Sequence, residues 1–180
     1  EALLEVAKYL HQTLGTVDML YSDEDKVNNG GLFEEPYFKP AWAKEMLKGQ
    51  MYTGQLGVYR TRVIKDLGGF REELDEQPSD TPRRKLLKKV GQFQEDLYPP
   101  QIWDMVLRLT AQPRHIQHIP KILYHRRLQL PVFTVEFCKI VQAELTREGH
   151  GGHVTVSPLA PTTGLLHYPA HGQPLVSIII

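Results

Sequence analysis

Residues 17–25, Val-Asp-Met-Leu-Tyr-Ser-Asp-Glu-Asp, are the stretch on which our interpretation of the fold depends. Large apolar side chains dominate residues 17–21, which is typical of a short buried strand. The strand runs directly into the acidic triplet Asp23-Glu24-Asp25. Two carboxylates two residues apart at the end of a strand can converge on one divalent cation, because Mg²⁺ and Mn²⁺ prefer oxygen ligands and often share them with substrate phosphates. A solvated acidic turn is the alternative, since aspartate is common in turns.

Helical and strand patterns alternate on both sides of this stretch. An apolar stripe within residues 3–14 predicts a helix that ends near Gly15. Pro40 and Pro99-Pro100 stand where two further helices would begin, because proline is tolerated in the first turn of a helix. The other expected elements are a helix over 40–48, a strand over 55–59, a short helix between Thr61 and Gly68-Gly69, a helix over 101–112, strands over 115–118 and 122–124, and an amphipathic helix within 129–149. This alternation predicts an α/β fold.

The composition excludes several classes of protein. The 180 residues carry 21 Lys plus Arg and 21 Asp plus Glu, so the formal net charge is zero and a globally basic nucleic-acid binder is not expected. No apolar stretch approaches the roughly 18 residues that a membrane-spanning helix needs. Cys138 is the only cysteine, so it cannot form a disulfide within the chain, and it suits a reducing compartment.

The charges are unevenly distributed along the chain. Residues 71–100 are rich in acidic and then basic side chains, which favours a solvated insertion; a basic surface for phosphate or anionic lipid is the alternative. No Asp, Glu, Lys or Arg follows Glu148, and the chain ends on a strand-like apolar run over 175–180. His150, His153, His167 and His171 in this uncharged part have spacings found in zinc sites, although solvated histidines in a linker are the simpler interpretation.

Six ordered motifs within residues 1–128 resemble bacterial family 2 glycosyltransferases. They are Tyr-Ser-Asp-Glu-Asp-Lys (21–26), Pro-Tyr-Phe-Lys-Pro-Ala-Trp (36–42), Gly-Gln-Leu-Gly-Val-Tyr-Arg (54–60), Gly-Gly-Phe-Arg (68–71), Gln-Ile-Trp-Asp-Met-Val-Leu-Arg-Leu (101–109) and His-Ile-Pro-Lys-Ile-Leu-Tyr-His (118–125). The resemblance implies a GT-A fold, a Rossmann-like mixed sheet flanked by helices. It also implies transfer of a sugar from a nucleotide-sugar donor to a glycan or lipid-linked acceptor in bacterial surface polysaccharide synthesis.

By this resemblance, the acidic triplet would bind the donor. Asp23, Asp25 and His125 would hold Mg²⁺ or Mn²⁺ against the donor diphosphate, and Asp23, Glu24 and Trp103 would contact the donor itself. A bound dication would stabilise the charge that develops on the leaving nucleoside diphosphate. The alternatives are a structural hydrogen bond for His125 and burial in the core for Trp103.

The catalytic base departs from the family pattern. Relatives carry an aspartate at the position of Ile102, and isoleucine cannot accept a proton from an acceptor hydroxyl. Asp104 and Asp96 are therefore the candidate catalytic residues. The carboxylate of Asp104 could equally interact with the dipole at the start of the helix, or form an ion pair with Arg108 four residues later.

The resemblance also predicts an unusual organisation. We expect 1–128 to be the C-terminal half of a glycosyltransferase domain without its nucleotide-binding half, 129–149 a bridging helix, and 150–180 a linker with the opening strand of a following domain. That strand would pair with a vacant edge in its own chain or in a neighbouring copy. Such a piece would be inactive alone, would reside in the cytoplasm or at the periphery of the inner membrane, and would be prone to dimerise through exposed half-domain surfaces. The alternative function is a non-catalytic glycosyltransferase-like module for interaction or acceptor binding.

Overall fold

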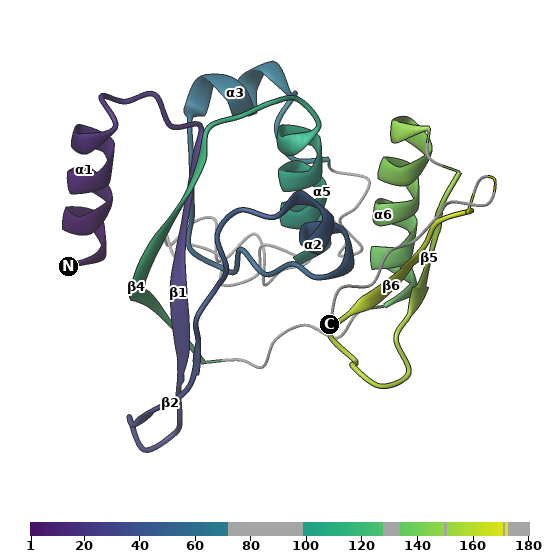
Figure 1. The fold of residues 1–180 in the computed structure, drawn as a ribbon. Helices are drawn as coiled ribbons and strands as arrows, with labels where there is room; N and C mark the ends of the chain where they lie inside the picture. The colour runs from purple at the N-terminus through teal and green to yellow at the C-terminus, as the bar shows by residue number, and fades with distance from the viewer. Residues whose placement is uncertain (72–98, 128–133, 150, 171, 173–180) are drawn as a thin grey trace, which may run out of the picture.

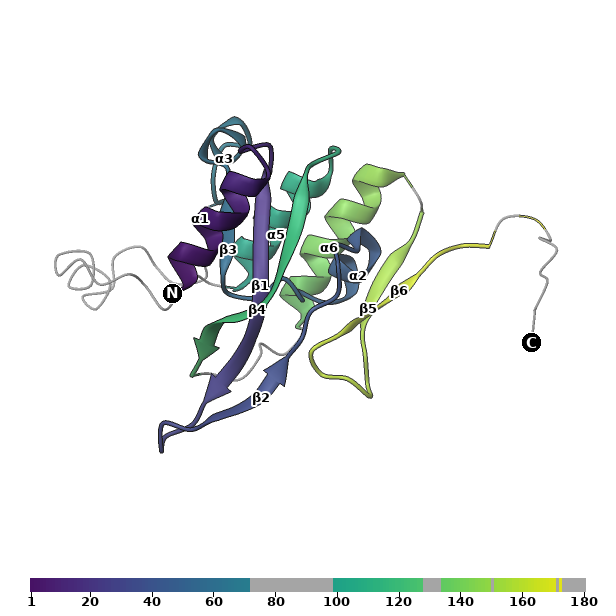
Figure 2. The same cartoon turned by 60° about the vertical axis from the view of Figure 1, so that its left-hand side comes forward.

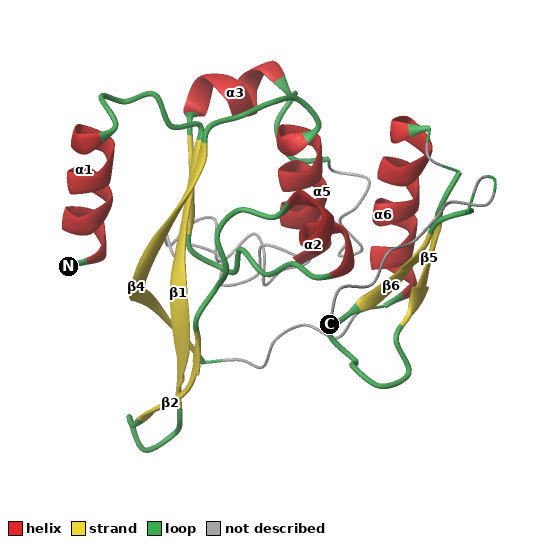
Figure 3. Ribbon diagram, in the orientation of Figure 1, coloured by secondary structure: helices red, strands yellow, loops and turns green. Residues whose placement is uncertain are grey.

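A mixed sheet with helices on both faces forms the body of the protein, as a computed structural model of residues 1–71, 99–127, 134–149, 151–170 and 172 shows (Figures 1 and 3). The central strand is β1 (Met19–Val27). It pairs in parallel with β4 (Ile116–Arg126) on one side, and antiparallel with β3 (Gly57–Tyr59) and β2 (Phe33–Tyr37) on the other. The α/β class that the sequence predicts is therefore confirmed.

Each face of this sheet has its own apolar core. Helix α1 (Ala2–Gln12) covers one face, where Val6, Val17, Leu20 and Ile119 are buried together (Figure 1). The helices α2 (Lys44–Gly49), α3 (Thr61–Asp66) and α5 (Pro99–Thr110) lie on the other face. Because side chains alternate along a strand, Leu20 faces α1 while its neighbours in β1 face the larger core.

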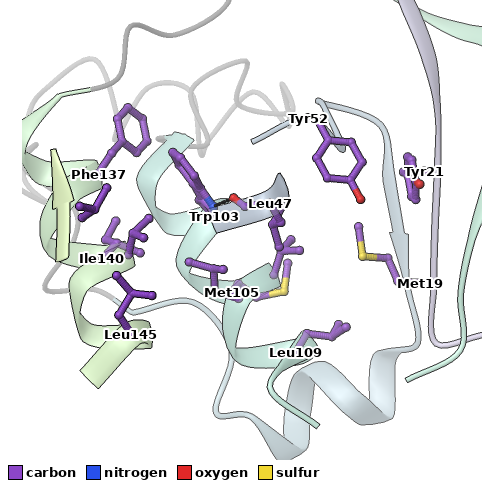
Figure 4. Packing of buried hydrophobic residues seen from close by; sticks show 14 of the residues in the cluster. Met19, Tyr21, Leu47, Tyr52, Trp103, Met105, Leu109, Phe137, Ile140 and Leu145 are labelled. Atoms are coloured by element: carbon purple, nitrogen blue, oxygen red, sulfur yellow. Dashed lines mark hydrogen bonds between the residues drawn. The ribbon is translucent and has the colours of Figure 1, made fainter. Parts of the chain in front are cut away.

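The larger core continues into the last part of the described chain. Helix α6 (Val135–Glu148) packs beside α5, with Phe137 against Trp103 at 5.0 Å between ring centroids (Figure 4). Strands β5 (His153–Val156) and β6 (Gly164–His167) form an antiparallel hairpin that packs on α6 and α2. Gly149 ends α6 at φ 74°, the left-handed conformation that its sequence position predicts.

Several element boundaries differ from the sequence prediction. Strand β1 is longer than 17–21 and includes the whole acidic triplet, which is therefore neither a turn nor the mouth of a strand. The two short strands expected at 115–124 form one strand, in which Pro120 is accommodated by a register shift: Ser22 pairs with Ile119 and Asp23 with Ile122. Proline has no N–H to donate to the neighbouring strand, and the bulge leaves Pro120 out of the hydrogen-bonded pairs of β1 and β4.

Three smaller differences concern the remaining elements. Strand β2 was not expected, because its sequence, Phe-Glu-Glu-Pro-Tyr, lacks the alternation of a half-buried strand. Helix α2 begins at Lys44 and not near Pro40. Helix α5 begins at Pro99, two residues earlier than predicted, and ends at Thr110.

Some predicted features lie outside the described residues. These are most of the charged insertion, including the candidate base Asp96, the apolar run over 175–180, and two of the four tail histidines, His150 and His171. Within the described parts of the chain, no helix combines the length and the apolar character that crossing a membrane requires.

Candidate acidic site at the centre of the sheet

The acidic triplet lies buried in the middle of the central strand. Asp23, Glu24 and Asp25 are 4%, 0% and 6% exposed, although each carries a carboxylate. Buried carboxylates are strongly disfavoured unless they are paired or hydrogen-bonded. Each of the three must therefore have partners from neighbouring segments, and these partners define the site.

The two aspartates each contact a histidine of the parallel neighbour β4. Asp23 Oδ1 lies 2.7 Å from His118 Nε2, and Asp25 Oδ1 lies 2.5 Å from His125 Nδ1. His118 is mostly covered and stacks on Tyr21 with a centroid distance of 5.0 Å, whereas the side chain of His125 is 46% exposed. Both aspartates are thus buried, and His125 is the accessible member of the second pair.

Asp23 has a further partner that anchors the chain after β2. Its Oδ1 also accepts a hydrogen bond of 2.8 Å from the backbone amide of Lys39. This places the side chain of Lys39 beside the central strand, where it is buried together with Glu24. Asp23 therefore has its contacts within the protein, and only 5% of its side chain is exposed.

Glu24 takes part in a buried ion pair. Its Oε2 accepts a hydrogen bond of 3.0 Å from Lys39 Nζ, which also donates to the carbonyl oxygen of Thr53 at 3.0 Å. The other carboxylate oxygen lies 3.8 Å from Arg126 Nε. Gly54 covers the pair at φ 77°, and a Cβ at this position would overlap both Lys39 Nζ and the Glu24 carboxylate. Glycine is therefore required here both by conformation and by space.

Burial changes the proton affinity of this lysine. Desolvation lowers the pKa of Lys39 below its usual range, although the neighbouring carboxylate of Glu24 acts in the opposite direction. The lysine thus binds its proton less tightly than a surface lysine does. It remains held in place by two hydrogen bonds, to Glu24 and to Thr53.

The donor set decides what kind of metal site these residues could form. Within the described ranges, no group of three or more His, Cys, Asp or Glu side chains is arranged to hold a metal ion. The structure brings together two of the three predicted ligands, Asp25 and His125, and directs Asp23 toward His118. Mg²⁺ is commonly held by one or two carboxylates together with phosphate oxygens and water. Two side chains are too few to hold a metal ion by themselves, so an ion bound here would need further oxygen ligands from a bound molecule or water.

Two other predicted site residues, Trp103 and Asp104, lie in the core of the helical layer. Trp103 is 2% exposed, and its Nε1 donates a hydrogen bond of 2.9 Å to the carbonyl oxygen of Leu47, so neither ring face is open to a sugar (Figure 4). Asp104 pairs with Arg108 Nε at 2.8 Å and with Arg71 Nη1 at 3.2 Å. The ion pair with Arg108 is the alternative that the sequence spacing indicated for Asp104.

Sequence reasoning missed three residues of this site: His118, Lys39 and Arg126. Parallel pairing of β1 with β4 brings His118 and Arg126 to the triplet from about 100 residues away, and such distant pairing leaves no local periodicity in the sequence. Lys39 follows β2 and is held there by the hydrogen bond from its amide to Asp23. A weak signal was present nonetheless. His118 and His125 lie at the two ends of one mostly apolar segment. Asp23 and Asp25 likewise lie at the two ends of the triplet, so two histidines are available for two aspartates.

Comparisons with known proteins were made for the whole chain. No family model matches it. The chain is 30% identical to the O-antigen biosynthesis protein RfbC of Myxococcus xanthus over 99% of its own length, which is 13% of that protein. It is 29% identical to the uncharacterized protein y4gI of Sinorhizobium fredii over 90% of its length, which is 17% of that protein. The chain thus spans less than a fifth of either relative.

Proposed function

We propose that this chain takes part in bacterial polysaccharide synthesis, as the acidic, metal- and diphosphate-binding segment of a glycosyltransferase. The observation that carries the proposal is the 30% identity to an O-antigen biosynthesis protein over 99% of the chain. The Asp25–His125 pair supports it, because the carboxylate of Asp25 on the central strand is bonded to an imidazole of β4 whose side chain is 46% exposed.

In this proposal the three carboxylates have different roles. Asp25 and His125 would hold Mg²⁺ or Mn²⁺, which when bound stabilises negative charge on a leaving diphosphate. Asp23 and Glu24 are bonded to the amide and the ammonium group of Lys39 after β2, so we assign them to holding the strand in place and not to the nucleotide-sugar. A nucleotide-sugar donor and a glycan or lipid-linked acceptor are the partners that we propose, together with attachment at the periphery of the inner membrane and a homodimer.

Manganese-induced NMR line broadening tests the metal assignment residue by residue. With uridine diphosphate present, Mn²⁺ should first broaden the amide signals of residues 24–26 and 124–126, since broadening falls steeply with distance. Asp25→Asn and His125→Ala should each abolish this local effect. Asp66→Asn is the matched control, because that carboxylate is 68% exposed on α3 and distant in the sequence. Broadening that is unchanged in Asp25→Asn would refute the assignment.

A second function is favoured by the surroundings of Asp104. Its carboxylate is held by two arginines, and Ile102 occupies the usual position of the base, so the described part of α5 offers no free proton acceptor at either position. The alternative is a glycan-binding module that does not transfer sugar. Release of nucleoside diphosphate from a panel of nucleotide-sugars by the natural protein separates the two. Release by the natural protein supports an enzyme, whereas release gained only in Ile102→Asp supports the non-catalytic module.

A further inference from the structure

Two histidines face each other across the β5–β6 hairpin. The antiparallel register pairs His153 directly with His167, and their rings stack with 4.5 Å between centroids and 9° between planes. Both residues are exposed, because Val154 and Leu166, which alternate with them along the strands, face the core. The hairpin lies beside α6, on the opposite side of the molecule from α1 (Figure 2). The pair therefore belongs to a different sheet from the acidic triplet.

A hydrogen bond orients one of the two rings. The hydroxyl oxygen of Thr155, two residues after His153 on the same face of β5, lies 2.9 Å from His167 Nε2. With the proton on Nε2, the ring donates to Thr155 and leaves Nδ1 as its free acceptor. Metal-binding histidines commonly donate their second N–H to an oxygen in this way, which fixes the tautomer and the ring orientation. Within the described part of the chain, no hydrogen bond involves the ring of His153.

The donor set suits a late first-row transition metal ion. Neutral imidazoles bind Zn²⁺, Cu²⁺ and Ni²⁺, whereas Mg²⁺ prefers oxygen ligands. In a tetrahedral zinc site with Zn–N bonds of about 2.0–2.1 Å, two ligating nitrogens lie about 3.3 Å apart. Directly opposite residues of an antiparallel pair have Cβ atoms only about 4.5–5.5 Å apart. A tilt of each ring out of the stack therefore brings one nitrogen of each histidine within reach of the same ion, without a change in the backbone.

We propose that His153 and His167 bind Zn²⁺ or a related transition metal ion between the two strands, with water completing the coordination, and that Thr155 is the positioning residue for His167. The ion joins the strands at the open end of the hairpin, since the connection over residues 157–163 lies at the other end. Because the hairpin packs on α6 and α2, the bound ion also stabilises this contact. The site does not depend on the proposed function.

A zinc titration of the isotope-labelled, untagged chain tests this site by NMR. His150→Gln and His171→Gln are introduced first, so that these two histidines, which lie outside the described residues, contribute no ligand. In this background protein, Zn²⁺ should shift the amide signals of residues 153–155 and 165–167. Mg²⁺ at the same concentration should not shift them, because the site offers imidazole nitrogens and not carboxylate oxygens.

Substitutions in the background protein separate the ligands from the positioning residue. His153→Gln and His167→Gln should each abolish the shifts at the zinc concentration that half-saturates the background protein. Thr155→Val should weaken zinc binding about ten-fold, as loss of the partner of a ligating histidine typically does, and Thr155→Ser should retain it. His11→Gln is the matched control, because His11 is also exposed but lies on α1, so this variant should bind zinc as the background protein does.

Each outcome decides the proposal. The site is overturned if Zn²⁺ causes no shift in the background protein, if Mg²⁺ causes the same shifts, or if His153→Gln binds zinc unchanged. An equal loss in His11→Gln also overturns it, as do zinc shifts that occur only at residues 124–126 around His125. Unchanged binding in Thr155→Val, together with loss in His153→Gln, supports the two ligands and overturns the role of Thr155. All the substituted side chains of the hairpin are exposed, so unchanged amide signals outside it verify that each variant is folded.

Discussion

The buried ion pair between Lys39 and Glu24 offers the sharpest test of how the acidic strand is stabilised. Both side chains are 0% exposed. Lys39 Nζ donates a hydrogen bond of 3.0 Å to the Glu24 carboxylate, which is shorter than the 3.4 Å hydrogen bond from the amide of Gln55. Lys39→Met would leave Glu24 with the amide of Gln55 at 3.4 Å and the more distant Arg126 at 3.8 Å. Removing one partner of a buried pair typically costs 3–5 kcal/mol, and because Arg126 remains nearby we expect about 3 kcal/mol.

Urea unfolding followed by circular dichroism measures this loss as a change in the free energy of unfolding. Lys8→Met is the matched control: Lys8 pairs with Glu5, but its side chain is 54% exposed, so we expect a change of about 0.5 kcal/mol or less. The double variant Lys39→Met/Glu24→Leu should recover about 2 kcal/mol relative to Lys39→Met, because replacing both partners removes the uncompensated charge. A loss below about 1 kcal/mol in Lys39→Met, or no recovery in the double variant, would refute the reasoning.

Three further predictions concern residues outside the acidic strand. Trp103→Phe should lower the free energy of unfolding by about 1–3 kcal/mol in urea titrations, because the carbonyl of Leu47 loses its buried donor. Asp104→Asn should destabilise the fold by about 3 kcal/mol while leaving manganese broadening at residues 24–26 unchanged. Lys121→Met should raise the pKa of Glu5 from about 2 toward its usual value, seen by NMR titration, since the hydrogen bond from Lys121 is the main cause of the low pKa. As the folded pKa is depressed, the stability linked to Glu5 is present above about pH 4.5 and is lost as the pH falls toward 2, and the variant, which keeps the hydrogen bond from Lys8, should show a weaker dependence.

Local sequence signals were sufficient for the elements that bury one apolar face. Helix α1 and helix α6 follow from apolar spacing, and Gly149 ends α6 in the left-handed conformation that glycine allows. Strand β2 could not be predicted in this way. Its residues are mostly exposed, and it is held by pairing with β1 and not by a buried face.

The candidate site was predictable in part. Its central carboxylates and His125 were identified from the triplet and the resemblance, but the contact of Asp23 with His118 depends on the parallel register that places His118 opposite Tyr21. The ion pair of Asp104 with Arg108 was one of the alternatives, because residues four apart share a helical face. Trp103 is covered by α6, whose Phe137 packs against it. The local sequence of neither helix predicts that α5 and α6 pack side by side.

The acidic triplet is best understood through the segments that compensate its charge. Three consecutive carboxylates within a buried strand would prevent folding if they were left unpaired. Lys39 follows β2, whereas His118 and His125 belong to β4, about 100 residues away in the chain. The central strand can therefore be buried only when β4 and the segment after β2 are in place. Asp25 is buried like the other two carboxylates, and its partner His125 is the half-exposed group of this pair. The distant partners that allow the strand to be buried therefore include one accessible side chain, the imidazole of His125, and its position is fixed by the contact with Asp25. A fixed and accessible side chain is what a binding site requires.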